Sequence, residues 1–184
     1  SLVLDFLREL GDSDGALRAA DSALDLCARE ASVSPRLKAN VLRAKGILLR
    51  RLGRTHEAVQ AYAQSIALLR SVGAHRSEAR TTNALAYAVM VLGRYEDAIA
   101  LGMSSVALDL SVGGRFQLAK TMAVIGRCYE RLGDVSRALA YLARARQAHA
   151  RYGDQDGRTD TLLVSAEVFS TAGQLEQAAG FLEE

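Results

Sequence analysis

Arginine is the residue type in this sequence best suited to recognising a chemical group. The chain has 23 basic residues, and the only lysines among them are Lys38, Lys45 and Lys120. The planar guanidinium group binds carboxylates and phosphates through two parallel hydrogen bonds. The net charge is only +2, which is too small to imply nucleic acid or a membrane as the partner.

The side chains that most often carry catalysis or bind metals are scattered along the chain. His56, His75 and His149 fall in different segments at unrelated helical positions, whereas a metal site needs converging ligands. We therefore expect surface or turn histidines. No G-x-G-x-x-G pattern follows a strand, and no G-K-[ST] motif occurs. The sequence predicts no enzyme, no metal site and no cofactor.

A recurrent skeleton defines the elements that must position the basic residues. It consists of an apolar residue, a glycine, four mostly polar residues and an alanine. Successive glycines are 42, 40, 40 and 40 residues apart, and a fixed period of that length is typical of a repeat array. The skeletons are Leu10-Gly11…Ala16, Leu52-Gly53…Ala58, Leu92-Gly93…Ala98, Leu132-Gly133…Ala138 and Ala172-Gly173…Ala178.

Each period contains two helical patterns. The first ends at the glycine of the skeleton, because glycine can adopt the left-handed conformation that closes a helix. The second ends at another glycine, Gly73, Gly113 or Gly153. Ser34 and Pro35 give a clear helix start. The helices expected are the end of one at 1–10, then 16–31, 35–52, 55–72, 75–92, 95–112, 115–132, 135–152, 158–172 and 175–184.

Small residues recur at two fixed offsets from the turn. One is the alanine five residues after each turn glycine, and the other lies seven residues before it. Small side chains at these places allow the two helices of a hairpin to approach closely. We therefore expect all of them to be buried contacts: Ala58, Ala98, Ala138 and Ala178, with Gly46, Ala86, Gly126 and Ala166 opposite.

These offsets resemble those of the tetratricopeptide repeat family. The two best copies read Ile125-Gly126, Tyr129, Gly133, Ala138, Leu142, Ala145 and Gly46, Leu49, Gly53, Ala58, Tyr62. The 40-residue period is similar to the long-repeat branch found in bacterial signalling ATPases of the maltose-regulator type, quorum-sensing peptide receptors and spindle-orientation scaffolds. The family proline after the second helix is missing, and Gly102 stands where a large aromatic residue is common.

The expected fold is all-α: a right-handed α-solenoid of stacked antiparallel helix hairpins, with about four full repeats and a partial N-terminal one. We expect one array over 1–184, with repeats at about 1–33, 34–73, 74–113, 114–153 and 154–184. Both ends look cut from a longer protein, and their uncapped apolar surfaces favour self-association.

Cys27 and Cys128 are too far apart to pair within an extended array. We expect free thiols, with Cys128 buried and inert, and a reducing, cytoplasmic location. The longest apolar run, at 84–92, is half the length needed to span a bilayer.

The resemblance implies that the first helices of the hairpins line a concave surface. Inward positions lie thirteen, ten, six and three residues before each turn glycine. The residues at these positions make the concave surface of repeats two to four cationic, with one acidic residue, and that of repeat five acidic. They are Asn40, Arg43, Ile47 and Arg50; Arg80, Asn83, Tyr87 and Met90; Lys120, Ala123, Arg127 and Glu130; and Asp160, Leu163, Glu167 and Ser170.

The ligand-binding residues expected in this groove are Asn40, Arg43, Ile47, Arg80, Asn83, Tyr87, Lys120 and Arg127. Asn83 begins an Asn-Ala-Leu-Ala segment similar to the N-x-L-[GA] motif of the long-repeat branch, where such an asparagine contacts ligand backbone. The simpler interpretation is a solvated helix face, and for Arg50, near a helix end, this is the favoured one.

The sequence favours a non-catalytic interaction module that binds a protein or peptide segment with acidic groups in this groove. The alternative is a regulatory or oligomerisation segment of a larger bacterial signalling or transcription-regulator protein, with the partner in the same parent chain. Nucleic-acid binding is less favoured, because no basic run is interleaved with exposed aromatic residues.

Overall fold

The computed structural model describes residues 13–30, 32–113, 116–152 and 155–171, and within these ranges every regular element is a helix. The expected helical segments at 1–10 and 175–184 lie outside the described residues. The helices are α2 (Ser13–Arg29), α3 (Pro35–Arg51), α4 (Thr55–Ser71), α5 (His75–Val91), α6 (Tyr95–Ser111), α7 (Phe116–Arg131), α8 (Val135–Tyr152) and α9 (Gln155–Thr171).

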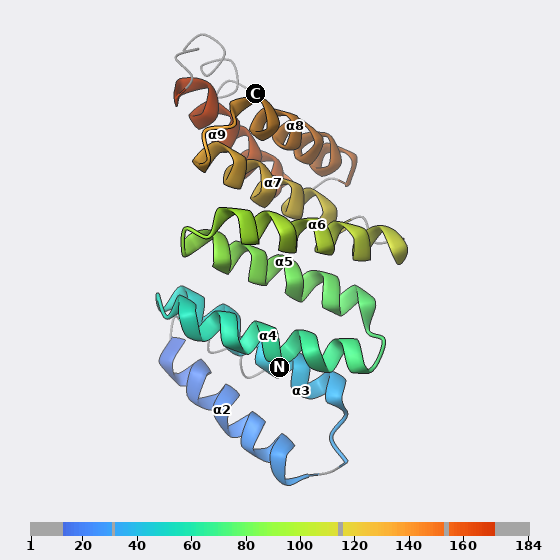
Figure 1. Cartoon of the computed structure of the whole chain (residues 1–184). Helices are drawn as coiled ribbons and strands as arrows, with labels where there is room; N and C mark the ends of the chain where they lie inside the picture. The colour runs from blue at the N-terminus through green and yellow to red at the C-terminus, as the bar shows by residue number, and fades with distance from the viewer. Residues whose placement is uncertain (1–12, 31, 114–115, 153–154, 172–184) are drawn as a thin grey trace.

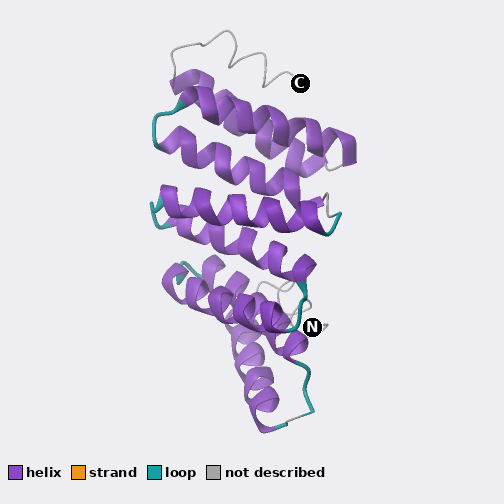
Figure 2. Ribbon diagram, turned by 45° about the vertical axis from the view of Figure 1, so that its right-hand side comes forward, coloured by secondary structure: helices purple, strands orange, loops and turns teal. Residues whose placement is uncertain are grey.

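Consecutive helices pack against each other and form antiparallel hairpins, α3 with α4, α5 with α6 and α7 with α8 (Figure 1). The hairpins stack one on the next, with α2 and α9 at the two ends of the described stack (Figure 2). The first helices also contact one another in series, α3 with α5, α5 with α7 and α7 with α9. They therefore form one continuous layer, and the all-α stacked-hairpin fold expected from the sequence is confirmed.

The turn at Gly93 shows why the skeleton glycine is needed. Gly93 has a φ of 77°, a conformation that residues with a Cβ rarely adopt. Its N–H donates to the Met90 carbonyl (2.9 Å), and the Arg94 N–H donates to the Val89 carbonyl (3.2 Å). This is the paired closure of a Schellman motif, which satisfies the last carbonyls of α5. Gly53 and Gly133 close α3 and α7 with the same two bonds.

Two helices begin earlier than the sequence predicted, whereas α3 begins as expected. The Leu37 N–H donates to the Ser34 hydroxyl oxygen (3.3 Å), and Pro35 is the first helical residue. α2 starts at Ser13 and α9 at Gln155, so each has a glycine, Gly15 or Gly157, in its first turn. The sequence pattern does not predict these starts, because a glycine in the first turn of a helix resembles the last residue of a preceding turn.

Small residues hold the two helices of each hairpin together, as predicted. Ala58, Ala98 and Ala138 have no exposed surface. A Cβ added at Gly46 would lie 2.5 Å from Cε1 of Tyr62, and one at Gly126 would lie 2.9 Å from Cγ of Leu142. A missing side chain on the first helix thus makes room for a large one on the second. Ala178 lies outside the described residues.

Gly102 occupies the position that Tyr62 and Leu142 fill in the other hairpins. A Cβ there would lie 2.7 Å from Cγ1 of Ile125, which belongs to α7 of the next hairpin. Ile125 has no exposed surface. The departure from the family pattern at Gly102 is therefore compensated by a side chain from the neighbouring repeat.

Buried hydroxyl groups add a polar link within two hairpins. Ser65 donates to the Ala39 carbonyl (2.7 Å), and Ser105 donates to the Ala79 carbonyl (2.9 Å). Both serines have no exposed surface, so each bond is shielded from water. Among the described helices, none is both long and apolar enough to cross a membrane.

Candidate ligand-binding groove

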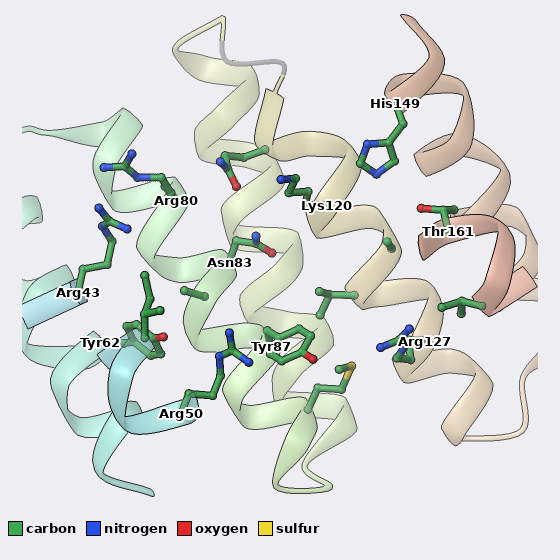
Figure 3. Close-up of a pocket in the computed structure, with 17 residues that line it drawn as sticks. Arg43, Arg50, Tyr62, Arg80, Asn83, Tyr87, Lys120, Arg127, His149 and Thr161 are labelled. Atoms are coloured by element: carbon green, nitrogen blue, oxygen red, sulfur yellow. The ribbon is translucent and has the colours of Figure 1, made fainter. Parts of the chain in front are cut away.

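A groove of about 570 Å³ runs along the layer of first helices (Figure 3). The side chains that line it come mainly from α3, α5 and α7, with α4, α8 and α9 contributing at the floor and at one end. The lining residues are Arg43, Ile47, Arg50, Tyr62, Arg80, Asn83, Ala84, Tyr87, Met90, Gln117, Lys120, Ala123, Val124, Arg127, His149, Thr161 and Val164.

Seven of the eight residues expected to form the site are among these lining residues. The exception is Asn40, which is half-buried on α3 and does not line the groove. Arg50 does line it, although its position near a helix end suggested a solvated role. The structure thus brings the predicted side chains together on one surface, as inward positions on adjacent helices require.

The charge of the groove is more one-sided than the sequence predicted. Its lining contains five cationic side chains and no aspartate or glutamate. Glu130, the acid expected in repeat four, is absent from the lining, and its carboxylate lies 3.2 Å from Nε of Arg131. Close cations without acids raise the electrostatic potential of a partly enclosed groove and attract anions.

The five cations form two rims separated along the helices. One rim contains Arg43, Arg80 and Lys120, and the other contains Arg50 and Arg127. Arg43 and Arg50 are seven residues apart on α3, and Lys120 and Arg127 are seven residues apart on α7. Seven residues correspond to two helical turns, or roughly 10 Å. In Figure 3, Arg80 lies beside Arg43, whereas Arg50 and Arg127 lie on either side of Tyr87.

Asn83, on α5, lies between these rims, and Tyr87, also on α5, lies in the second rim beside Arg50 (Figure 3). The guanidinium carbon of Arg50 is 4.8 Å from the centre of the Tyr87 ring, which is a cation–π contact. The Asn83 side-chain oxygen is buried and has no hydrogen-bond partner among the described residues. A buried acceptor without a donor is unfavourable, so this amide is suited to an N–H group brought by a ligand.

Two residues of the second helices reach the groove between the first helices. Tyr62, from α4, is fully buried. Burial raises the pKa of Tyr62, and the positive charges of Arg50 and Arg43 oppose that rise. Helical spacing from the turn glycines predicts only first-helix residues in the groove, so it does not identify Tyr62 as a lining residue.

His149, from α8, corrects the expectation that the histidines lie at the surface or in turns. It is 2% exposed, and it occupies the position at which α4 carries the buried Leu69. His56 and His75 are exposed, as expected. The spacing of 80 residues from Leu69, which is two repeat periods, was the signal that could have identified His149 as buried.

The inward positions expected in repeat five are not those that the structure uses. Leu163, Glu167 and Ser170 are exposed and do not line the groove, whereas Thr161 and Val164 do. The side chain of Asp160 lies outside the described residues. α9 contacts α7 and closes one end of the groove, so it contributes residues that face back toward α7.

The thiol and carboxyl groups of the described residues offer no additional chemistry in this groove. No group of three or more His, Cys, Asp or Glu residues within the described ranges could hold a metal ion. Both cysteines are free. Cys128 is fully buried, and burial raises its pKa to about 12, so its thiol is protonated at neutral pH and unreactive.

Comparison with known families identifies the repeat. The model of the tetratricopeptide repeat matches residues 5–71 and 77–151. The chain belongs to the tetratricopeptide repeat family. Searching the curated proteins found no match.

Several solved structures share the fold of this tetratricopeptide repeat chain. BtubC from P. vanneervenii has a TM-score of 0.83 and 21% identity, covering 98% of this chain and 74% of its own. The Rap conjugation gene regulator of plasmid pLS20, in complex with the Phr* peptide, has a TM-score of 0.83 and 16% identity, with 98% and 49% covered. A Rap protein complexed with competence and sporulation factor has a TM-score of 0.84 and 13% identity, with 98% and 50% covered. The chain therefore spans about half of each Rap protein.

Proposed function

We propose that this tetratricopeptide repeat array is a non-catalytic interaction module in the cytoplasm, and that its groove binds an acidic peptide or protein segment. The observation that carries the proposal is the groove lining, which has five cations and no acid. A carboxylate is the anionic group that proteins present most often, and arginine binds it through paired hydrogen bonds.

The uncharged residues that line the groove favour a polypeptide over a simple anion as the ligand. Asn83 offers a buried amide oxygen without a partner among the described residues, and a backbone N–H is the commonest donor that a peptide could bring. Tyr87, Ile47 and Met90 add apolar surface to the lining. A Rap regulator of the same fold is in complex with the Phr* peptide, which supports a peptide as the class of ligand.

A binding measurement with the purified protein tests this proposal. The probe is a short fluorescein-labelled peptide rich in glutamate, and the same peptide with glutamine at those positions is its control. The acidic peptide should bind, its affinity should fall as the NaCl concentration rises, and the glutamine peptide should bind at least tenfold more weakly, or about 1.4 kcal/mol.

Charge reversal locates the binding surface. Arg43→Glu and Arg127→Glu should each weaken binding of the acidic peptide by roughly tenfold or more. Arg51→Glu is the matched control, because Arg51 follows Arg50 but is exposed and outside the groove. An equal loss in all three variants would contradict a specific groove. Preferred binding of single-stranded nucleic acid with a steep dependence on salt would favour the competing function.

A further inference from the structure

The exposed face of α6 carries an apolar row, beside which the exposed residues are Ser104 and Ser111. Between Asp97 and the end of α6 the only charged residue is Asp109, and that residue is buried. Met103 is 40% exposed and Leu110 is 63% exposed, and Ala100 and Ala107 are exposed on the same helix. A surface helix of a globular protein normally turns charged or polar residues to water.

These four residues, here called the α6 stripe, have the spacing of a helix-packing seam. Ala100, Met103, Ala107 and Leu110 are separated by three, four and three residues. That spacing places them in one row along the helix, and it is the spacing at which two helices interdigitate. The α6 stripe is therefore shaped to receive a second helix.

The other hairpins show that the fold itself does not require this stripe. The matching positions, 40 residues away, are Gln60, Ala63, Ala67 and Arg70 in α4, and Ala140, Ala143, Gln147 and Ala150 in α8. Neither set has a large apolar side chain. Among α4, α6 and α8, only α6 therefore carries large apolar side chains at these positions, and the other two helices have small or polar ones.

A cationic row on α8 lies beside the α6 stripe. The Tyr141 hydroxyl, on α8, donates to Sδ of Met103 (3.6 Å), so the two outer helices meet there. Val135–Tyr152 has no acidic residue. Arg137, Arg144 and Arg151 are exposed at seven-residue intervals, which places them in one row along α8. Arg137 is paired with Asp134, just before α8, so the positive charge of this row comes mainly from Arg144 and Arg151.

The aromatic rings beside the arginine row, Tyr129 and Tyr141, already make contacts through their faces. Tyr129 and Tyr141 stack with centroids 5.6 Å apart, and the guanidinium carbon of Arg137 lies 4.6 Å from the centre of the Tyr129 ring. The guanidinium carbon of Arg144 lies 5.6 Å from the centre of the Tyr141 ring. Stacking of nucleic-acid bases needs open ring faces, so this arrangement favours a protein partner.

We infer that the α6 stripe is a second docking surface, which binds an amphipathic helix whose apolar face covers the α6 stripe and whose acidic flank lies along α8. The apolar row on α6 would pack against the apolar face of the partner helix. The arginine row on α8 would attract acidic residues on the flank of that helix. This surface is formed by second helices, so it is separate from the groove formed by the first helices. Binding here does not depend on the proposed groove function.

The test uses two designed helical peptides with the same leucine face, one flanked by glutamate and the other by lysine. Their affinities for the full chain are measured by fluorescence anisotropy. The glutamate peptide should bind at least tenfold more tightly than the lysine peptide. Leu110→Arg, which installs the residue found at position 70, should weaken binding of the glutamate peptide by at least tenfold, and Arg144→Gln should reduce the preference for it.

Ala67→Arg is the control: it places the same charge at an exposed position of α4, the one that matches Ala107 of the α6 stripe, and it should leave binding unchanged. Leu110 is exposed, so the circular dichroism spectrum and thermal midpoint of Leu110→Arg should match those of the unmodified chain. The inference is overturned if both peptides bind equally or if Leu110→Arg binds as tightly as the unmodified chain. Sedimentation showing a dimer that Leu110→Arg dissociates would also overturn it, because the occupant would then be a second copy.

Discussion

Asp109 provides the sharpest test of how a buried carboxyl group affects the stability of this array. It is 2% exposed on α6, and its Oδ2 has no hydrogen-bond partner among the described residues. Burial raises its pKa, and the charge of Arg76 only partly opposes that rise. The matching position in α4 is Leu69, which is completely buried.

Asp109→Leu should therefore stabilise the protein at neutral pH. The substitution removes a buried group without a partner, which costs about 1–3 kcal/mol, and places a leucine where a sister helix already holds one. We expect the free energy of unfolding to rise by about 1–3 kcal/mol, which corresponds to an increase of roughly 2–10 °C in the thermal midpoint of a chain of this length.

The dependence on pH separates the charge from the packing. Because the pKa of Asp109 is raised in the folded state, the folded chain binds this proton more tightly than the unfolded chain does. Stability is then lost as the pH rises from the ordinary carboxyl pKa through the raised one. Asp109→Asn should abolish this part of the decline. The assay is thermal unfolding followed by circular dichroism across acidic and neutral pH.

Two results would refute this reasoning about Asp109. One is a lower thermal midpoint for Asp109→Leu at neutral pH, which would mean that the carboxylate has a stabilising role. The other is an unchanged pH dependence of stability in Asp109→Asn, which would mean that the group does not titrate differently on folding.

The remaining predictions concern the hairpin contacts and the buried thiol. Gly46→Ala should lower the free energy of unfolding by about 1–3 kcal/mol in urea titrations, because its Cβ would meet the Tyr62 ring; a gain in stability would show that helix propensity outweighs the clash. Ala98→Leu should cost a similar ~1–3 kcal/mol, because Ala98 has no exposed surface, and an unchanged midpoint would contradict close helix packing there. Cys128 should resist iodoacetamide at neutral pH until the chain unfolds, since its pKa is raised to about 12; rapid modification of the folded chain at Cys128, read by mass spectrometry, would count against its burial.

The fold could be predicted from the sequence because its turns and helix contacts each require a particular type of residue. Each turn at Gly53, Gly93 and Gly133 needs a left-handed residue, and each hairpin needs small residues where its helices touch. Both requirements are met by residue type alone, so the helices from α3 to α8 were predicted to within one or two residues at each end. Helix starts at α2 and α9 were less predictable, because a glycine in the first turn of a helix resembles one in a preceding turn.

The lining of the groove was predictable only in part. Helical spacing identified the first-helix residues Arg43, Arg80 and Arg127, because their inward direction follows from the period of the helix. Tyr62 and His149 reach the groove through gaps between helices, and those gaps depend on how the hairpins stack. The contribution of α9 depends on its place at one end of the groove. A pattern averaged over the repeats carries no information about that place.

The most direct measurement of the central claim is a crystal structure of the protein with a bound glutamate-rich peptide. The account predicts the peptide on the layer formed by α3, α5 and α7, with carboxylates on Arg43, Arg80 or Arg127 and a backbone N–H donating to Asn83. A peptide bound elsewhere on the chain, or bound in the groove with its carboxylates directed away from these arginines, would contradict it.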